Sequence, residues 1–307
     1  MVETPRTGSP ALDAATRAWV EHGWERQVVA VEPLSGGFTS TMLRLAAADS
    51  SFAVLRLMTK EPWRRHAPGL LTRERDVQRL LADTGVPVPT SLALDAEGRE
   101  ASAPAHLMTL LPGRTELERH DDALLAALWG LVDAVHAVEP DGPDRPRAFQ
   151  SWAHEAKRVV PTSSTRATVW REAFRLLEST PPAFEAGFLH RDLHLGNVLW
   201  EQGRVTGVVD WVETSWGPAE LDVAHATTYL ALLHGPDVAE RFLALRPGRG
   251  SDPILPAPDR LHWHVMDVVG QLPDPVKVTQ PWRDRGVVVT EWTAYARLEE
   301  WLGRLLG

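Results

Sequence analysis

The chain has 307 residues, of which 44% are hydrophobic and 24% charged, with no cysteine and a formal net charge of −9. This is enough material for two domains or one large two-lobed unit, and the absence of cysteine excludes disulfides and thiolate metal sites. No apolar run approaches the roughly 20 residues of a membrane span, and the polar segment 1–10 lacks a signal-peptide core, so we expect a cytoplasmic protein with no membrane partner.

The net charge is unevenly distributed along the chain. Residues 1–114 carry 13 acidic and 13 basic side chains, whereas residues 115–307 carry 28 and 19. An acidic surface repels nucleic acid and attracts cations, so we expect no nucleic-acid partner. The acidic excess serves either solubility alone or the binding of a polycationic substrate.

The first third of the chain has the pattern of a small β-rich lobe. Residues 13–23 predict a helix, and apolar residues between 70 and 81 share one helical stripe that ends near Thr84-Gly85. Pro112-Gly113 then interrupts the pattern. Short segments rich in strand-favouring residues are joined by turns. The predicted strands are 28–34, 41–46, 52–58, 92–94 and 106–111.

The remainder of the chain is mostly helical in pattern. An apolar face over 123–135 predicts a helix that Asp121 or Asp122 can cap, and the chain closes with a helix over 291–306. The region around Trp263 and Trp282 is predicted to be irregular. Short strands are expected at 187–190, 198–200 and 205–209. The sequence therefore predicts an α+β protein with a β-rich lobe over 1–111 and a larger helical lobe over 112–307.

The most informative segment joins two of these short strands. Residues 190–197 read His-Arg-Asp-Leu-His-Leu-Gly-Asn, and Asp210 follows Asn197 by thirteen positions at the end of a predicted strand. Phosphoryl transfer needs a positioned nucleophile and compensation of phosphate charge. Asp192 can accept a hydroxyl proton, and the side-chain oxygens of Asn197 and Asp210 are hard ligands that suit Mg²⁺. The segment therefore indicates phosphoryl transfer from a nucleotide.

Together these residues resemble the catalytic segment of the aminoglycoside phosphotransferases and of related kinase-like small-molecule phosphotransferases such as choline kinases. The resemblance continues through 207–211 and 217–224 and covers the chain from about residue 25 to the final helix. It implies a bilobal protein-kinase-like fold, in which a small antiparallel β-sheet lobe with one main helix binds nucleotide and a larger helical lobe is catalytic. By resemblance, Asp192 is expected to be the catalytic base, Asn197 and Asp210 the Mg²⁺ ligands, and ATP or GTP the donor.

The same resemblance implies nucleotide-binding residues in the first lobe. Glycines let backbone N–H groups approach phosphate, and the strand over 106–111 is expected to read the adenine against an apolar pocket. Residues expected to contact the nucleotide in these two places are Ser35, Gly36, Gly37, Thr39, Met108 and Leu110.

A basic residue on the third strand is expected to hold the phosphates. Protein kinases use lysine there, whereas this chain has Arg56, which can grip phosphate in a bidentate way. Arg56 lies among apolar neighbours on its strand face, so it needs a partner, and Glu74 on the following helix is the expected one. Lys60 is the alternative phosphate contact.

The acceptor is expected to be a small hydroxylated molecule. It is either a cationic antibiotic such as an aminoglycoside or, alternatively, the amino alcohol, sugar or ketosamine substrate of a metabolic kinase. A nucleotide-binding pseudokinase is a third hypothesis, against which the intact catalytic residues argue. Asp222 is expected to lie in a helix starting after Gly217-Pro218 and to hold the catalytic loop through its backbone N–H groups. The acids that could bind a cationic acceptor are Glu213, Asp267, Asp274 and Glu291.

Overall fold

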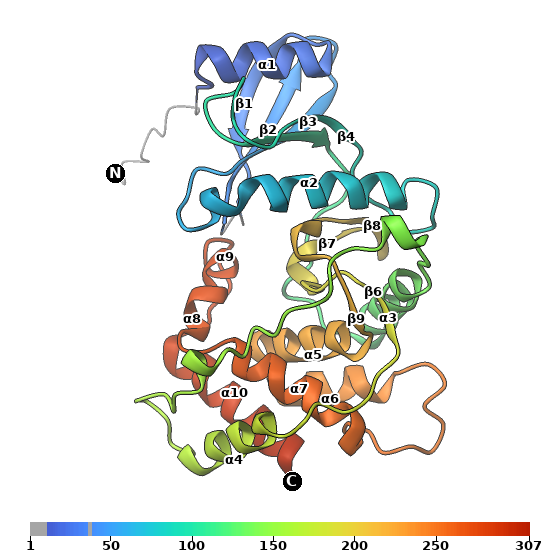
Figure 1. Cartoon of the computed structure of the whole chain (residues 1–307), viewed down its shortest axis with the longest axis vertical. Coiled ribbons are helices and arrows are strands. Elements are labelled where there is room, and N and C mark those ends of the chain that lie inside the picture. Colours follow the sequence, from blue (N-terminus) through green and yellow to red (C-terminus); the bar gives the residue numbers. More distant parts are fainter. Residues whose placement is uncertain (1–10, 36–38) are drawn as a thin grey trace. The chain divides into compact units, whose positions relative to one another are not determined.

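The computed structural model describes residues 11–35 and 39–307 (Figure 1). Contacts divide the chain into two compact units. The first unit comprises residues 1–79 and 89–111, and the second comprises residues 80–88 and 112–307. Among the described residues, no helix is long and apolar enough to cross a membrane.

The first unit is built on one antiparallel five-stranded sheet with the strand order β1-β2-β3-β5-β4. All five strands were predicted, and their observed ends differ from the predicted ones by three residues at most. The helices of this unit are α1 (Ala14–Trp24) and α2 (Trp63–Leu81), the latter ending in the second unit. The strands are β1 (Val28–Pro33), β2 (Thr41–Ala47), β3 (Phe52–Leu57), β4 (Ser91–Asp95) and β5 (Ala105–Thr109).

The two faces of this sheet have different neighbours because successive strand side chains point in opposite directions. On one face, Leu55 of β3 packs with Trp19 of α1 in a buried cluster. On the other face, Met58, just past β3, packs against Leu71 of α2. Figure 1 shows α1 lying along the sheet. Arg56 alternates with Leu55, so it belongs to the face that α2 covers.

The second unit is helical around one central element, α5, whose residues Glu220 to Leu233 are all buried. A helix that is buried on every side must be packed all round, and α5 contacts α6, α7 and α10 (Figure 1). The helices of this unit are α3 (Asp122–His136), α4 (Ala167–Glu178), α5 (Glu220–His234), α6 (Pro236–Ala244), α7 (Pro258–Gly270), α8 (Pro275–Val278), α9 (Gln280–Arg283) and α10 (Glu291–Leu306).

The region around Trp263 and Trp282 is helical, so the prediction of irregular structure there is wrong. Trp263 lies in α7 and Trp282 in α9. Each of α7, α8 and α9 carries a proline at its first or second position. Proline is tolerated there because the first N–H groups of a helix have no partner within it. In this region proline therefore begins helices.

Two short antiparallel ribbons complete the second unit. The strand β6 (Ala186–Leu189) pairs with β9 (Ser215–Pro218), and β7 (Val198–Glu201) pairs with β8 (Arg204–Val208). The sequence predicted β6, β7 and β8 but not β9. Pro218 ends β9, and α5 starts at Glu220, after Gly217-Pro218 as predicted. The strand tolerates this proline because it is an edge strand of a two-stranded ribbon.

Candidate active site

The predicted catalytic loop, residues 190–197, runs from β6 to β7, and α5 supports it. One carboxylate of α5 holds the start of the loop: Asp222 Oδ2 accepts a hydrogen bond from the His190 N–H at 2.9 Å, and Oδ1 accepts one from the Arg191 N–H at 2.7 Å. Asp222 is fully buried. The predicted role of Asp222 in holding the loop backbone is therefore confirmed.

The pKa of Asp222 shows that it holds the loop as an anion. Burial alone would raise this pKa, but the hydrogen bond and charge of His136 and the N–H group of Arg191 bring it below its usual value. A hydrogen bond to a carboxylate anion is worth more than one between neutral groups. The loop is consequently fixed to α5 by two strong backbone contacts.

His190 connects the same loop to β8. Its Nδ1 accepts a hydrogen bond from the Asp192 N–H at 3.2 Å, and its Nε2 lies 3.1 Å from the carbonyl oxygen of Val209. Since Nδ1 accepts, Nε2 carries the proton and donates it to that carbonyl. Burial lowers the pKa of His190 despite the nearby charges of Asp222 and Asp192. His190 thus orients the loop as a neutral ring.

The register of β7 and β8 brings the two predicted metal ligands together in the fold. Val198 pairs with Val208, and the Val209 N–H donates to the carbonyl oxygen of Asn197 at 3.0 Å. Asp210 follows immediately in a left-handed conformation with φ of 68°. This conformation is uncommon for a residue other than glycine, and such residues concentrate at functional sites.

Both carboxylate oxygens of Asp192 accept hydrogen bonds within the second unit. Asn197 Nδ2 donates to Oδ2 at 3.0 Å, and His225 Nε2 lies 3.0 Å from Oδ1. The Asp192 side chain keeps 24% of its surface exposed, so a substrate can reach it. Burial alone would raise the pKa of Asp192, but the hydrogen bond and the charge of His225 hold it well below its usual value.

Asn197 and Asp210 offer oxygen ligands that suit a hard divalent cation. The amide nitrogen of Asn197 donates to both the backbone and the side chain of Asp192, which leaves its amide oxygen as the end able to ligate a cation. An amide oxygen together with the carboxylate of Asp210 is the donor set that Mg²⁺ prefers. The residues present therefore fit the ion that the resemblance implies.

A second group of potential metal ligands is a hydrogen-bonded cluster. Ligand atoms of Asp192, His194 and His225 lie within 4.8 Å of one another. However, Nδ1 of His194 accepts a hydrogen bond from the Gly196 N–H at 3.0 Å, so its Nε2 carries the proton and is no ligand. Both ring nitrogens of His225 face carboxylates. The hydrogen bond from Gly196 gives His194 a local structural role in the loop.

In the first unit, the predicted pairing of Arg56 with Glu74 is confirmed. Arg56 Nη2 lies 3.0 Å from Glu74 Oε1, and the two residues are only 3% and 1% exposed. The second oxygen of Glu74 lies 2.9 Å from His106 Nδ1. The sequence did not single out His106 for this role. Its signal is the strand register, since His106 of β5 is directly opposite Arg56 of β3.

The other residues expected at the nucleotide occupy different environments. Met108 is buried on β5, where the Gln78 Nε2 lies 3.6 Å from its sulfur, and Leu110 follows the strand partly buried. Thr39 is partly buried and Ser35 is exposed. Gly36 and Gly37 lie outside the described residues. Lys60, the alternative to Arg56, is exposed after β3.

Of the four acids considered for a cationic acceptor, three are engaged in local contacts. Glu213 forms an ion pair with Arg147 at 2.7 Å, and Asp274 accepts hydrogen bonds at the start of α8. Asp267 is buried in α7 and bonds to His225 at 2.9 Å. Glu291 lies in the first turn of α10. Asp267 is therefore connected to Asp192 through His225, a link that the sequence analysis missed.

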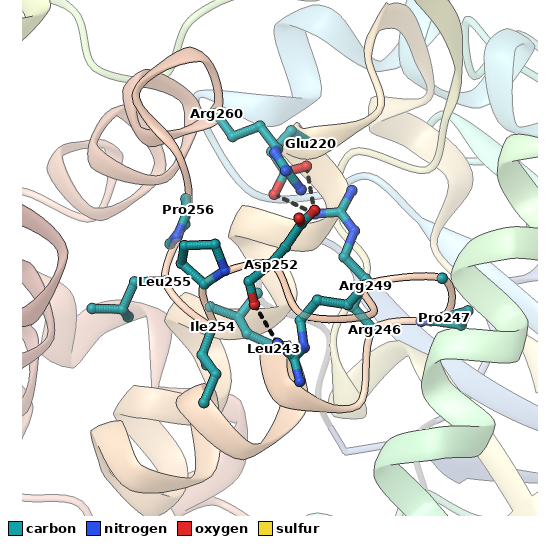
Figure 2. Close-up of a pocket in the computed structure, with 12 residues that line it drawn as sticks. Glu220, Leu243, Arg246, Pro247, Arg249, Asp252, Ile254, Leu255, Pro256 and Arg260 are labelled. Atoms are coloured by element: carbon teal, nitrogen blue, oxygen red, sulfur yellow. Dashed lines mark hydrogen bonds and ion pairs between the residues drawn. The ribbon is translucent and has the colours of Figure 1, made fainter.

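A pocket of about 100 Å³ lies near the start of α5, lined there by Glu220 and by residues of the segment 243–260 (Figure 2). Three of its charged side chains are engaged in local contacts: Glu220 bonds to Arg246 and His264, and Arg249 donates to the Asp252 carbonyl oxygen. The lining includes none of the residues predicted for catalysis or metal binding. This pocket is therefore separate from the candidate active site.

Comparison with known families identifies the class of protein. Residues 30–255 match the model of the phosphotransferase enzyme family. This match covers most of the chain, so the protein belongs to that family and is a phosphotransferase. Among curated proteins, acyl-CoA dehydrogenase family member 10 of Mus musculus is 27% identical over 181 residues, which are 51% of this chain and 16% of that protein. The chain thus matches only about a sixth of that relative's length.

Solved structures of aminoglycoside phosphotransferases share the fold. The enzyme APH(4)-Ia matches with a TM-score of 0.66 and 17% identity over 95% of this chain and 97% of that one. A putative aminoglycoside phosphotransferase from Ralstonia eutropha matches with a TM-score of 0.63 and 18% identity over 96% and 99%. A thermostable APH(4)-Ia mutant with a TM-score of 0.66 and 15% identity over 96% and 100% was solved with ADP and hygromycin B. These matches confirm the predicted kinase-like α+β fold.

Proposed function

We propose that the protein transfers the γ-phosphate of ATP or GTP to a hydroxyl group of a small molecule. The observation that carries this proposal is the arrangement of Asp192. Its carboxylate is held at both oxygens, bonded to the candidate metal ligand Asn197 and still 24% exposed. An ionised, oriented and reachable carboxylate is what a phosphoryl acceptor hydroxyl requires.

In the proposed reaction, Asp192 accepts a hydrogen bond from the acceptor hydroxyl and fixes the direction of its attack. The hydroxyl oxygen bonds to the γ-phosphorus, the bond from that phosphorus to the bridging oxygen breaks, and the hydroxyl proton passes to Asp192. Because the transition state of phosphoryl transfer is loose, the proton leaves late and a weak base suffices. The lowered pKa of Asp192 is compatible with that role.

A metal ion and a basic side chain would balance the charge of the nucleotide. Mg²⁺, held by Asn197 and Asp210, would neutralise charge on the phosphate oxygens. Arg56, which Glu74 holds in place, would bind the α- and β-phosphates. Ser35, Gly36, Gly37 and Thr39 would be further phosphate contacts. The adenine would lie against the segment of Met108 and Leu110.

Two classes of acceptor remain candidates. An aminoglycoside or another cationic antibiotic is supported by the likeness to APH(4)-Ia, which has been solved with hygromycin B. A neutral or singly charged alcohol, the substrate of a metabolic kinase, is supported by the pairing of Asp267 with His225 and of Glu213 with Arg147. Acids paired in this way are less available to several ammonium groups.

The proposal is tested with the Asp192→Asn variant. Asparagine keeps the shape of the side chain and removes its charge, so we expect phosphoryl transfer from Mg-ATP or Mg-GTP to fall by about 10²- to 10⁴-fold. Nucleotide affinity, measured by isothermal titration calorimetry, should stay within about threefold of the wild type. Equal rates for variant and wild type on the best acceptor of a broad alcohol panel would contradict the assignment of Asp192.

The acceptor class is tested by expressing the protein in a susceptible bacterium. A rise in the minimum inhibitory concentration of an aminoglycoside, absent with Asp192→Asn, would support the antibiotic acceptor. No change for any aminoglycoside, peptide or macrolide drug, together with transfer to a sugar or amino alcohol in vitro, would establish the metabolic alternative. Nucleotide binding without turnover on any acceptor would instead favour a pseudokinase.

A further inference from the structure

Asp192 is linked to a second buried carboxylate through one imidazole ring. His225 of α5 lies between the two acids, with Nε2 at 3.0 Å from Asp192 Oδ1 and Nδ1 at 2.9 Å from Asp267 Oδ1. His225 and the Asp267 side chain are completely buried. We call Asp267, His225 and Asp192 the carboxylate–imidazole relay. His225 contacts Oδ1 of Asp192, whereas Asn197 contacts Oδ2.

The contacts fix the protonation of the ring. An ionised carboxylate can only accept hydrogen bonds, so each nitrogen that faces one must donate. His225 is therefore an imidazolium with a proton on both nitrogens. Its positive charge and that of Arg191, 3.9 Å from Asp267, equal the two negative charges of the acids. This balance explains how four ionised groups can be grouped here with little exposure.

Aromatic side chains hold the ring in its plane. The Tyr229 ring lies 4.3 Å from that of His225, measured between centroids. Trp152 meets His225 edge-on at 5.4 Å and lies under the Arg191 guanidinium at 4.0 Å. These contacts restrict the rotation of the imidazole, so the direction of its Nε2–H bond toward Asp192 is fixed as well.

We infer that His225, held by Asp267, is a positioning residue that fixes the orientation and the negative charge of the Asp192 carboxylate for phosphoryl transfer. This inference rests on the proposed function. The relay is no proton shuttle, since an imidazolium with two protons has no lone pair to receive another. The proton of the acceptor hydroxyl stays on Asp192 until the product leaves.

The electrostatics of the site agree with this role. Burial alone would lower the pKa of His225, but Asp267 and Asp192 raise it to about 9. The other titratable groups near the ring are His194 and His190 of the loop and Tyr229 of α5, whose own pKa is raised by burial and by both acids. A raised pKa means that His225 keeps its charge below pH 9 and loses it as pH rises through that value.

Two substitutions separate positioning from simple packing. Asp267→Asn keeps an acceptor for the His225 Nδ1–H but removes the charge, so the pKa of His225 should fall toward the ordinary value of about 6.5. The alkaline limb of the kcat profile should then move down by about one pH unit or more. His225→Gln keeps a donor for Asp192 and His225→Leu does not, so we expect the glutamine variant to retain more activity.

His264 supplies a matched control. It is a buried histidine of α7 that bonds to a buried acid of α5, with Nε2 at 2.8 Å from Glu220 Oε1, and no contact with Asp192 is among its hydrogen bonds. His264→Gln should lower the melting temperature much as His225→Gln does, while its kcat stays within about twofold of wild type. For His225→Leu we expect kcat to fall about 10- to 100-fold, with little change in the KM for Mg-ATP.

The measured reaction is transfer from Mg-ATP to the best alcohol of the acceptor panel, or to water if no alcohol is used. Unchanged kcat and pH profile in Asp267→Asn and both His225 variants would overturn the inference. The inference would also be overturned if kcat fell in proportion to the melting temperature, with the same proportion in His225→Gln, His225→Leu and His264→Gln. A binding measurement with Mg-ATP confirms that each variant still takes up nucleotide.

A spectroscopic test is independent of turnover and so distinguishes failure of the relay from failure of the proposed function. In ¹⁵N-histidine NMR spectra of the wild-type chain, assigned with His225→Gln or His225→Leu, the His225 ring should show two protonated nitrogens at pH 8 and titrate near pH 9. A ring that is neutral at pH 8 would exclude the relay. If variants at His225 do not fold, Asp267→Asn supplies the comparison spectrum.

Discussion

Asp222 offers a direct test of how α5 supports the catalytic loop. Replacing it with alanine removes the acceptor of two buried backbone donors, the N–H groups of His190 and Arg191. Neither donor lies where water can readily replace the carboxylate, because both residues are at most 2% exposed. We therefore expect a large loss of stability and, because the displaced loop carries Asp192, a loss of activity that exceeds the loss of stability.

The size of the effect follows from the contacts. Each buried donor left without a partner costs about 1 to 3 kcal/mol, so two donors cost about 2 to 6 kcal/mol. His136, at 3.1 Å from the same carboxylate with a side chain 18% exposed, can be hydrated and adds little. Removal of a buried charge offsets part of the cost, which leaves about 1 to 4 kcal/mol. Asp222→Asn keeps one acceptor oxygen and should cost about half as much.

Urea denaturation measures the change in the free energy of unfolding, and the matched control is Glu299→Gln. Glu299 is another buried carboxylate, which accepts hydrogen bonds from the Thr165 N–H at 3.2 Å and Trp170 Nε1 at 2.8 Å. The control should lose stability but keep its kcat. A destabilisation by Asp222→Ala below about 1 kcal/mol would refute the reasoning. The reasoning would also be refuted if Asp222→Ala lost no more activity than Glu299→Gln does for the same loss of stability.

Other parts of the structure give further expectations. Asp210→Asn should raise the Mg²⁺ concentration that gives half-maximal activity, and an unchanged Mg²⁺ titration would contradict its assignment as a ligand. Glu74→Gln leaves the buried charge of Arg56 without its ion-pair partner and should destabilise the protein by about 3 kcal/mol, measured by urea denaturation, while raising the KM for nucleotide. Asp13 caps α1, and hydrogen bonds from Thr16 and Ser102 lower its pKa to about 2. A lowered pKa means that its stabilisation is present above pH 4 and is lost as pH falls toward 2, so the melting-temperature difference between wild type and Asp13→Ala should vanish there.

The first unit could be predicted closely because its signals are local. Alternation and turn residues specify the strands, and the position of Arg56 among apolar neighbours was enough to require a partner such as Glu74. His106 was missed because its role depends on which strand pairs with β3. The register that places His106 opposite Arg56 is a long-range property, and no local pattern of residues encodes it.

The second unit was predicted less completely because proline can indicate two opposite things and because one strand was missed. Proline both interrupts helices and begins them, so the segment containing α7, α8 and α9 gave the wrong prediction. Helix α5 begins after Gly217-Pro218 as predicted, but strand β9, which ends at Pro218, was not predicted. The proposed catalytic loop could be predicted because its residues are consecutive, whereas Asp267 joins it only through the packing of α7 on α5. His225 had a detectable signal, since it lies one turn after Asp222 on the same helix.

The burial of α5 and the precision required at Asp192 have a common cause. Asp222 and His225, three residues apart, lie on one face of α5 because residues at this spacing are neighbours on a helix. Asp222 fixes the loop backbone at His190 and Arg191, and His225 fixes the carboxylate two residues further on. Both contacts depend on one rigid helix, so small movements of α5 would displace the loop and the carboxylate together. The packing of α6, α7 and α10 around α5 therefore serves the geometry of the reaction as well as the stability of the fold.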